Sequence, residues 1–149
     1  MAPLELAEYV VQKCIQIEKP ISNLQLQKIL YFCQLQSMKS AMAFVMPDAI
    51  FEAWKFGPVI PDVYFTYCLY SGYPIYEKNK TIINFSMSVP IYVDQVIEAS
   101  LKKNPWELVA LSHKSGGAWE KASLKGLRTK IDNEDIIVES VGFNLLETL

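Results

Sequence analysis

The most reactive side chains in this chain are three cysteines and one histidine. Cys14, Cys33 and Cys68 lie far apart in the sequence, and His113 is the sole imidazole. A zinc site needs clustered Cys and His ligands, and a thiol nucleophile needs a base beside it. Because apolar residues surround each cysteine, the pattern favours buried, reduced thiols. We therefore expect no metal site and no catalytic Cys–His pair.

Signatures of phosphate binding and serine hydrolysis are also missing from the sequence. The pair Gly116-Gly117 is not part of a P-loop, which requires a following Gly-Lys-Ser/Thr. The chain contains no Gly-x-Ser-x-Gly elbow of the kind found in many hydrolases. We predict no enzyme activity, no catalytic residue and no cofactor. An unrecognised small enzyme is the least favoured alternative, and it requires Glu52, His113 and Glu120 to converge in one pocket.

Several large aromatic and polar residues are better candidates for recognition than for catalysis. Trp54 and Trp119 belong to short blocks rich in aromatic and polar residues. Tryptophan anchors protein cores and is also frequent in interface hot spots, so both roles stay open for this pair. His113 is placed at a predicted helix C-terminus, where the helix dipole favours a charged imidazole. A structural role there and a contact with a partner are both open.

Length and composition limit the class of protein to which this chain can belong. The 149 residues are 51% hydrophobic and 20% charged, which predicts one globular domain spanning 1–149. The formal net charge of -2 gives no help to a nucleic-acid binder, so nucleic acid is not an expected partner. Residues 114–130 carry five basic side chains and one acidic one, and residues 132–149 carry five acidic ones. Either these two segments pair with each other, or the first forms a basic strip that meets an acidic partner or a phosphate backbone.

The N-terminus and the apolar runs bear on localisation. No basic region precedes an apolar stretch near Met1, so we expect no secretory signal. The longest apolar run, residues 41–46, is too short to cross a bilayer. Together with reduced thiols, these features predict a cytoplasmic protein that does not enter a membrane.

The periodicity of apolar residues predicts a mainly α fold. A first helix begins at Leu4 and ends before Pro20. A second begins with a capping box of Ser22 and Gln25 and runs to about Ala43 as the central helix. The other expected helices cover residues 61–70, 89–102, 104–113, 118–124 and 132–145.

Two segments are expected to be extended or irregular. Residues 50–56 alternate weakly and predict a short strand or extended arm, which Gly57-Pro58 should end. Residues 75–85 predict a short hairpin or an irregular loop. We therefore predict a single compact multi-helix domain with a small β hairpin or short strand pair.

Short blocks in this chain resemble the Panacea antitoxin domain of SocA-like antitoxins, which occur in bacterial and prophage toxin–antitoxin systems. The resemblance rests on their order and spacing and covers nearly the whole chain. The blocks are residues 24–32 (LQLQKILYF), 53–59 (AWKFGPV), 111–113 (LSH), 117–119 (GAW) and 131–136 (IDNEDI).

The resemblance implies a helical domain that binds and neutralises a protein toxin encoded beside it, without catalysis. The alternative that it implies is a proteolytic adaptor that delivers the toxin to a Clp-type protease. From the polar and aromatic residues of these blocks we predict a partner-binding surface that contains Lys28, Trp54, Phe56, Gly57, Pro58, His113 and Trp119.

Overall fold

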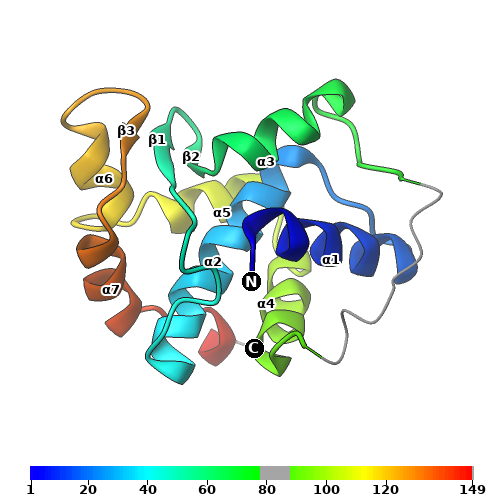
Figure 1. Ribbon diagram of the computed structural model, residues 1–149, viewed down its shortest axis with the longest axis horizontal. Helices are drawn as coiled ribbons and strands as arrows, with labels where there is room; N and C mark the ends of the chain where they lie inside the picture. Colours follow the sequence, from blue (N-terminus) through cyan, green and yellow to red (C-terminus); the bar gives the residue numbers. More distant parts are fainter. Residues whose placement is uncertain (78–87, 149) are drawn as a thin grey trace.

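Helices dominate the computed structural model, which describes residues 1–77 and 88–148 (Figure 1). They are α1 (Pro3–Gln16), α2 (Asn23–Ala41), α3 (Pro61–Thr66), α4 (Ile91–Leu101), α5 (Pro105–Ser112), α6 (Ala118–Ser123) and α7 (Asn133–Val141). Two 3₁₀ turns, η1 (Cys68–Tyr70) and η3 (Leu145–Thr148), complete the helical part. The prediction of a mainly α fold is confirmed.

A small antiparallel sheet lies at one end of the helical body (Figure 1). Its strands, in the order β2-β1-β3, are Gly57–Val59, Glu52–Trp54 and Thr129–Lys130. Ala53 pairs with Pro58 on one side and Thr129 on the other. The predicted small β element and the short strand within residues 50–56 are confirmed, but Gly57-Pro58 does not end the extended segment. The chain turns at Lys55 and Phe56 instead, so the Gly-Pro pair opens the second strand.

Helix α2 is the central element, as predicted, and its start is fixed by local hydrogen bonds. The Gln25 backbone N–H donates to Ser22 Oγ at 3.3 Å, and the Ser22 N–H donates to Gln25 Oε1 at 2.9 Å. This reciprocal capping box satisfies two donors that the first helical turn leaves without partners. In Figure 1, α2 runs through the middle of the fold between the other helices.

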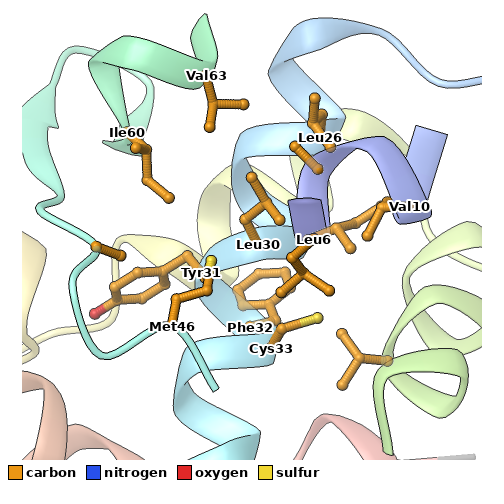
Figure 2. Packing of buried hydrophobic residues seen from close by; sticks show 14 of the residues in the cluster. Leu6, Val10, Leu26, Leu30, Tyr31, Phe32, Cys33, Met46, Ile60 and Val63 are labelled. Atoms are coloured by element: carbon orange, nitrogen blue, oxygen red, sulfur yellow. The ribbon is translucent and has the colours of Figure 1, made fainter. Parts of the chain in front are cut away.

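The core forms around the sides of α2 (Figure 2). Leu26, Leu30 and Phe32 of α2 are fully buried in one cluster with Leu6 and Val10 of α1. Figure 2 shows the side chains of both helices meeting in this cluster. Burial of apolar area on this scale is the main source of stability for a helical domain.

The cysteines only partly follow the prediction. Cys14 and Cys33 are buried, and burial raises the pKa of the Cys14 thiol to about 12. Cys68 is exposed, so the expectation that it is buried is wrong. The reason is local: α3 ends at Thr66 and Cys68 opens η1, which changes the direction of the chain.

The last helix begins as predicted but buries a different face. Asp132 caps α7 by accepting from the Glu134 N–H at 2.8 Å. Ile137 and Val141 are exposed, whereas Glu139 is buried. The Glu139 carboxylate accepts from Tyr31 and from the backbone of Ala118, and these bonds turn its face of the helix inward.

The basic and acidic segments near the C-terminus do meet at one point. Lys121 of the basic segment and Asp135 of the acidic one form an ion pair of 3.5 Å. This contact agrees with the interpretation that the two segments pair with each other.

The hairpin or loop predicted at residues 75–85 lies mostly outside the described residues. Its first residues, 75–77, have no regular secondary structure.

Within residues 1–77 and 88–148, no helix is both long and apolar enough to cross a bilayer.

We predict that Ser22→Ala lowers the free energy of unfolding by about 1 kcal/mol, because the side-chain acceptor of the α2 cap is lost. Chemical denaturation followed by circular dichroism measures this change. Ser115→Ala is the control, because Ser115 is exposed and lies outside any helix. Equal stability of the two variants would contradict the capping role of Ser22.

Candidate partner-binding site

The structure gathers the predicted partner-binding residues around the β1–β2 hairpin. Lys28 lies on α2 and donates from Nζ to the Pro58 carbonyl oxygen at 2.9 Å. Trp119 on α6 donates from Nε1 to the Trp54 carbonyl oxygen at 2.8 Å. His113, the C-cap of α5, stacks on Trp119 with ring centroids 3.6 Å apart and planes 6° apart. Residues far apart in sequence thus meet at one hairpin.

Lys28 is the least expected member of this group, because its side chain is fully buried. Its exposed fraction is 0%. Among the described residues, no carboxylate forms an ion pair with it. Burial of the ammonium group lowers the pKa of Lys28 from its ordinary 10.5 to about 7. Lys28 is therefore not a surface contact of the usual kind, and it reaches a partner only through a pocket.

Gly57 is required where it stands, because the backbone of β2 lies directly on Lys28. Its φ of 120° is in a region that L side chains rarely adopt. A Cβ atom at Gly57 would lie 2.6 Å from Ser112 Oγ and 2.7 Å from Lys28 Cε. Any larger residue would strain the backbone at this φ and would force the Lys28 or Ser112 side chain to shift.

His113 occupies the predicted helix terminus, as the C-cap of α5. Burial and the nearby Lys28 ammonium both lower the pKa of its imidazole below the ordinary value. Its Nε2 is buried and has no hydrogen-bond partner among the described residues. The His113 ring is instead held by its stack on Trp119, and the lowered pKa makes a charged imidazole at this helix end less favourable.

Trp54 is half-buried and takes part in both core and surface contacts. Its ring lies 4.9 Å from that of Tyr64 in an edge-on arrangement, and the Arg128 guanidinium lies 4.5 Å from the ring centroid. Trp54 Nε1 donates to Glu52 Oε1 at 2.9 Å. The Trp54 indole is thus held in place by Tyr64 on α3 and by Arg128, which directly precedes β3.

A pocket of about 260 Å³ lies between the hairpin and the N-terminal half of α2; we name it the hairpin pocket. Lys28, Trp54 and Phe56 line it among the predicted site residues. The other lining residues are Asn23, Leu24, Gln27, Lys55, Val59, Tyr64, Ser71 and Trp106. Two larger pockets, of about 350 and 370 Å³, lie elsewhere and contain none of the predicted site residues.

Amide side chains on the first turns of α2 fix the walls of the hairpin pocket. Asn23 Nδ2 donates to the Tyr64 carbonyl oxygen at 3.0 Å, which attaches α3 to α2. Gln27 Nε2 donates to Asn23 Oδ1 at 3.0 Å, and Gln27 Oε1 accepts from the Ile60 N–H at 3.0 Å. Because these amides are hydrogen-bonded, the pocket has its shape before any partner binds.

Trp106 is the main site residue that sequence reasoning missed. It is 62% exposed and packs edge-on against Phe56, with ring centroids 5.5 Å apart. The two rings form the outer rim of the hairpin pocket. The sequence did offer one signal for this residue: it is a tryptophan in the first turn of a predicted helix, where a side chain has few core neighbours.

The convergence that an enzyme would require is not found at this pocket. Glu52, His113 and Glu120 do not line it. Glu52 accepts from Trp54, and Glu120 accepts from the Gly116 N–H at 3.1 Å, so each carboxylate serves a local contact. Among the described residues, no group of three His, Cys, Asp or Glu side chains is arranged to hold a metal ion.

Comparison with known proteins places the chain in a family. The family described as "Antitoxin SocA-like, Panacea domain" matches residues 26–120. This match covers α2, the hairpin, His113 and Trp119. The chain belongs to this SocA-like family.

A curated relative agrees with this assignment. The chain is 34% identical over 128 residues to the protein named "Antitoxin SocA" of Caulobacter vibrioides, strain NA1000 / CB15N. The alignment covers 77% of the chain and 66% of the relative. The chain thus spans about two thirds of the length of that antitoxin. No solved structure matches the chain.

We predict that Lys28→Met makes the chain more stable by about 1–4 kcal/mol at pH 6, because a buried, uncompensated charge is replaced by an apolar side chain of similar length. The difference should shrink as the pH rises from 7 toward 10. In that range the unfolded state, with a lysine pKa of 10.5, binds more protons than the folded state, with a pKa of about 7, so the wild type gains stability. Denaturant titrations at several pH values measure this, and lower stability of the variant at pH 6 would refute it.

We predict that Gly57→Ala lowers the free energy of unfolding by roughly 2–4 kcal/mol, because it combines backbone strain with overlap against Lys28 and Ser112. Gly72→Ala is the matched control, since nothing lies within 4 Å of a Cβ atom built there. Thermal and chemical denaturation of both variants measure the difference. Similar stability of the two variants would show that β2 moves away from α2 at little cost.

Proposed function

We propose that this chain is an antitoxin that binds and neutralises a protein toxin encoded beside it, without catalysis. Membership of the SocA-like family supports this role. Because the chain spans only about two thirds of the curated relative, the toxin partner is part of the proposal and not a property taken over from that protein.

The observation that carries the proposal is the exposed aromatic rim of the hairpin pocket. Phe56 and Trp106 are 44% and 62% exposed, although they pack against each other. Aromatic side chains that border a preformed pocket are typical of interface hot spots. Phe56 stands on a hairpin that Lys28 and Trp119 hold to the helices, and Trp106 stands on α5, so little order must be gained on binding.

Co-expression tests the proposed function directly. The product of the adjacent open reading frame is expressed in a bacterial host with and without this chain, and growth is followed. We expect growth arrest by the neighbour alone and recovery with the chain. Recovery with no detectable complex between the purified proteins would contradict neutralisation by binding. The half-life of the neighbour in the same strains separates direct inhibition from removal by a protease.

We predict that the double variant Phe56→Ala, Trp106→Ala binds the neighbouring gene product at least tenfold more weakly than the wild type, because truncation of paired hot-spot rings typically costs 2 kcal/mol or more, about 30-fold in affinity. Isothermal titration calorimetry measures the dissociation constants. Ile91→Ala is the control: Ile91 is 77% exposed and lies on α4, away from the pocket lining. Undiminished affinity of a folded double variant would remove the aromatic rim from the interface.

A further inference from the structure

Lys28 presents a charge for which residues 1–77 and 88–148 supply no counterion. Its Nζ has three N–H donors, and the structure gives it one acceptor, the Pro58 carbonyl oxygen at 2.9 Å. Burying a lysine without a paired carboxylate costs stability, so such residues are rare unless they have a use. An apolar residue of similar length would fill the same space at lower cost. Packing within the chain therefore does not explain why a lysine occupies this position.

Lys28 is one of the residues that line the hairpin pocket, but its side chain is 0% exposed, so a partner group contacts its ammonium only after a neighbouring side chain moves aside. Lys28 lines the pocket together with Lys55, and no Asp or Glu is among the lining residues. Trp54, Phe56 and Trp106 supply aromatic walls. The pocket is thus concave and largely apolar, and its two charged lining residues, Lys28 and Lys55, are both basic. Its charge is complementary to an anionic group and not to a cationic one.

We propose that the hairpin pocket receives an aspartate or glutamate side chain of the toxin, whose carboxylate pairs with the Lys28 ammonium group. The inference deepens the proposed function and rests on it. The aromatic rim excludes water once the partner is seated, and an ion pair in such a site is much stronger than one at an open surface. The pocket volume of about 260 Å³ is suited to one side chain and not to a folded element.

The proposal has a characteristic pH dependence. Among the described residues, His113 at the end of α5 is close enough to Lys28 for the ammonium to affect its pKa, while Lys55, Tyr64 and the amides Asn23 and Gln27 line the same pocket. Lys28 in the free protein has a pKa of about 7, and a carboxylate beside it raises that value. Binding above pH 7 therefore takes up a proton. The imidazole of His113 has a lowered pKa and is already neutral in this range.

The test uses the full chain and the purified product of the adjacent gene. At pH 7 we expect Lys28→Met to bind roughly 10- to 100-fold more weakly, the range typical for loss of a charged hydrogen bond. The wild-type dissociation constant should rise by up to about tenfold per pH unit between pH 7 and 9, and that of the variant should stay flat. Lys19→Met is the control, because Lys19 is exposed and absent from the pocket lining.

The partner carboxylate is identified by a second set of variants. Each exposed Asp and Glu of the toxin is changed to Asn or Gln. We expect one such change to weaken binding to the wild-type chain and to have little further effect on binding to Lys28→Met, which is the sign of a direct pair. Additive losses for every acidic residue would overturn the pairing.

The outcomes separate this inference from the proposed function. If the wild type binds the toxin and Lys28→Met binds it equally tightly at pH 7 and at pH 9, the inference fails and the antitoxin function stands. If the wild type does not bind, both fail. If Lys28→Met does not fold, the pH dependence of wild-type binding still decides, and an affinity that is constant between pH 7 and 9 overturns the proposal.

Discussion

The contact between Lys28 and the second strand of the hairpin is the constraint on which the rest of the site depends. The ammonium group donates to the Pro58 carbonyl oxygen, and the lysine side chain lies so close to β2 that only a glycine fits at position 57. Ser112 at the end of α5 touches the same point. The buried Lys28 side chain therefore joins α2 to the second strand of the hairpin, and Ser112 of α5 lies beside the same glycine.

Much of the helical framework could be predicted from the sequence, because its signals are local. The capping boxes of Ser22 with Gln25 and of Asn104 with Glu107 begin α2 and α5 where the pattern indicated. These bonds join residues three positions apart, so no knowledge of the fold is needed to foresee them. The short strand within residues 50–56 could also be predicted, but the role of Gly57-Pro58 as the start of β2 could not, because it depends on contacts with α2.

The features that could not be predicted depend on distant contacts. Burial of a lysine opposes the usual preference of that residue for solvent. The meeting of Phe56 with Trp106 joins positions fifty residues apart in the chain. The inward turn of Glu139 follows from hydrogen bonds to Tyr31 and Ala118, which lie on two other helices. The seven candidate residues could be named from their blocks, but their assembly around one hairpin could not.

The same contacts suggest why so short a hairpin is suited to recognition. Strands of three residues are only marginally stable alone, since they bury little and close few hydrogen bonds. Here β1 is held by the Trp119 indole and by β3, and β2 is held by Lys28. These anchors come from the helical core, so the hairpin is ordered before a partner arrives and binding costs little conformational entropy. A charge kept at the expense of stability and a rigid aromatic rim are then two parts of the surface that we propose to meet the toxin.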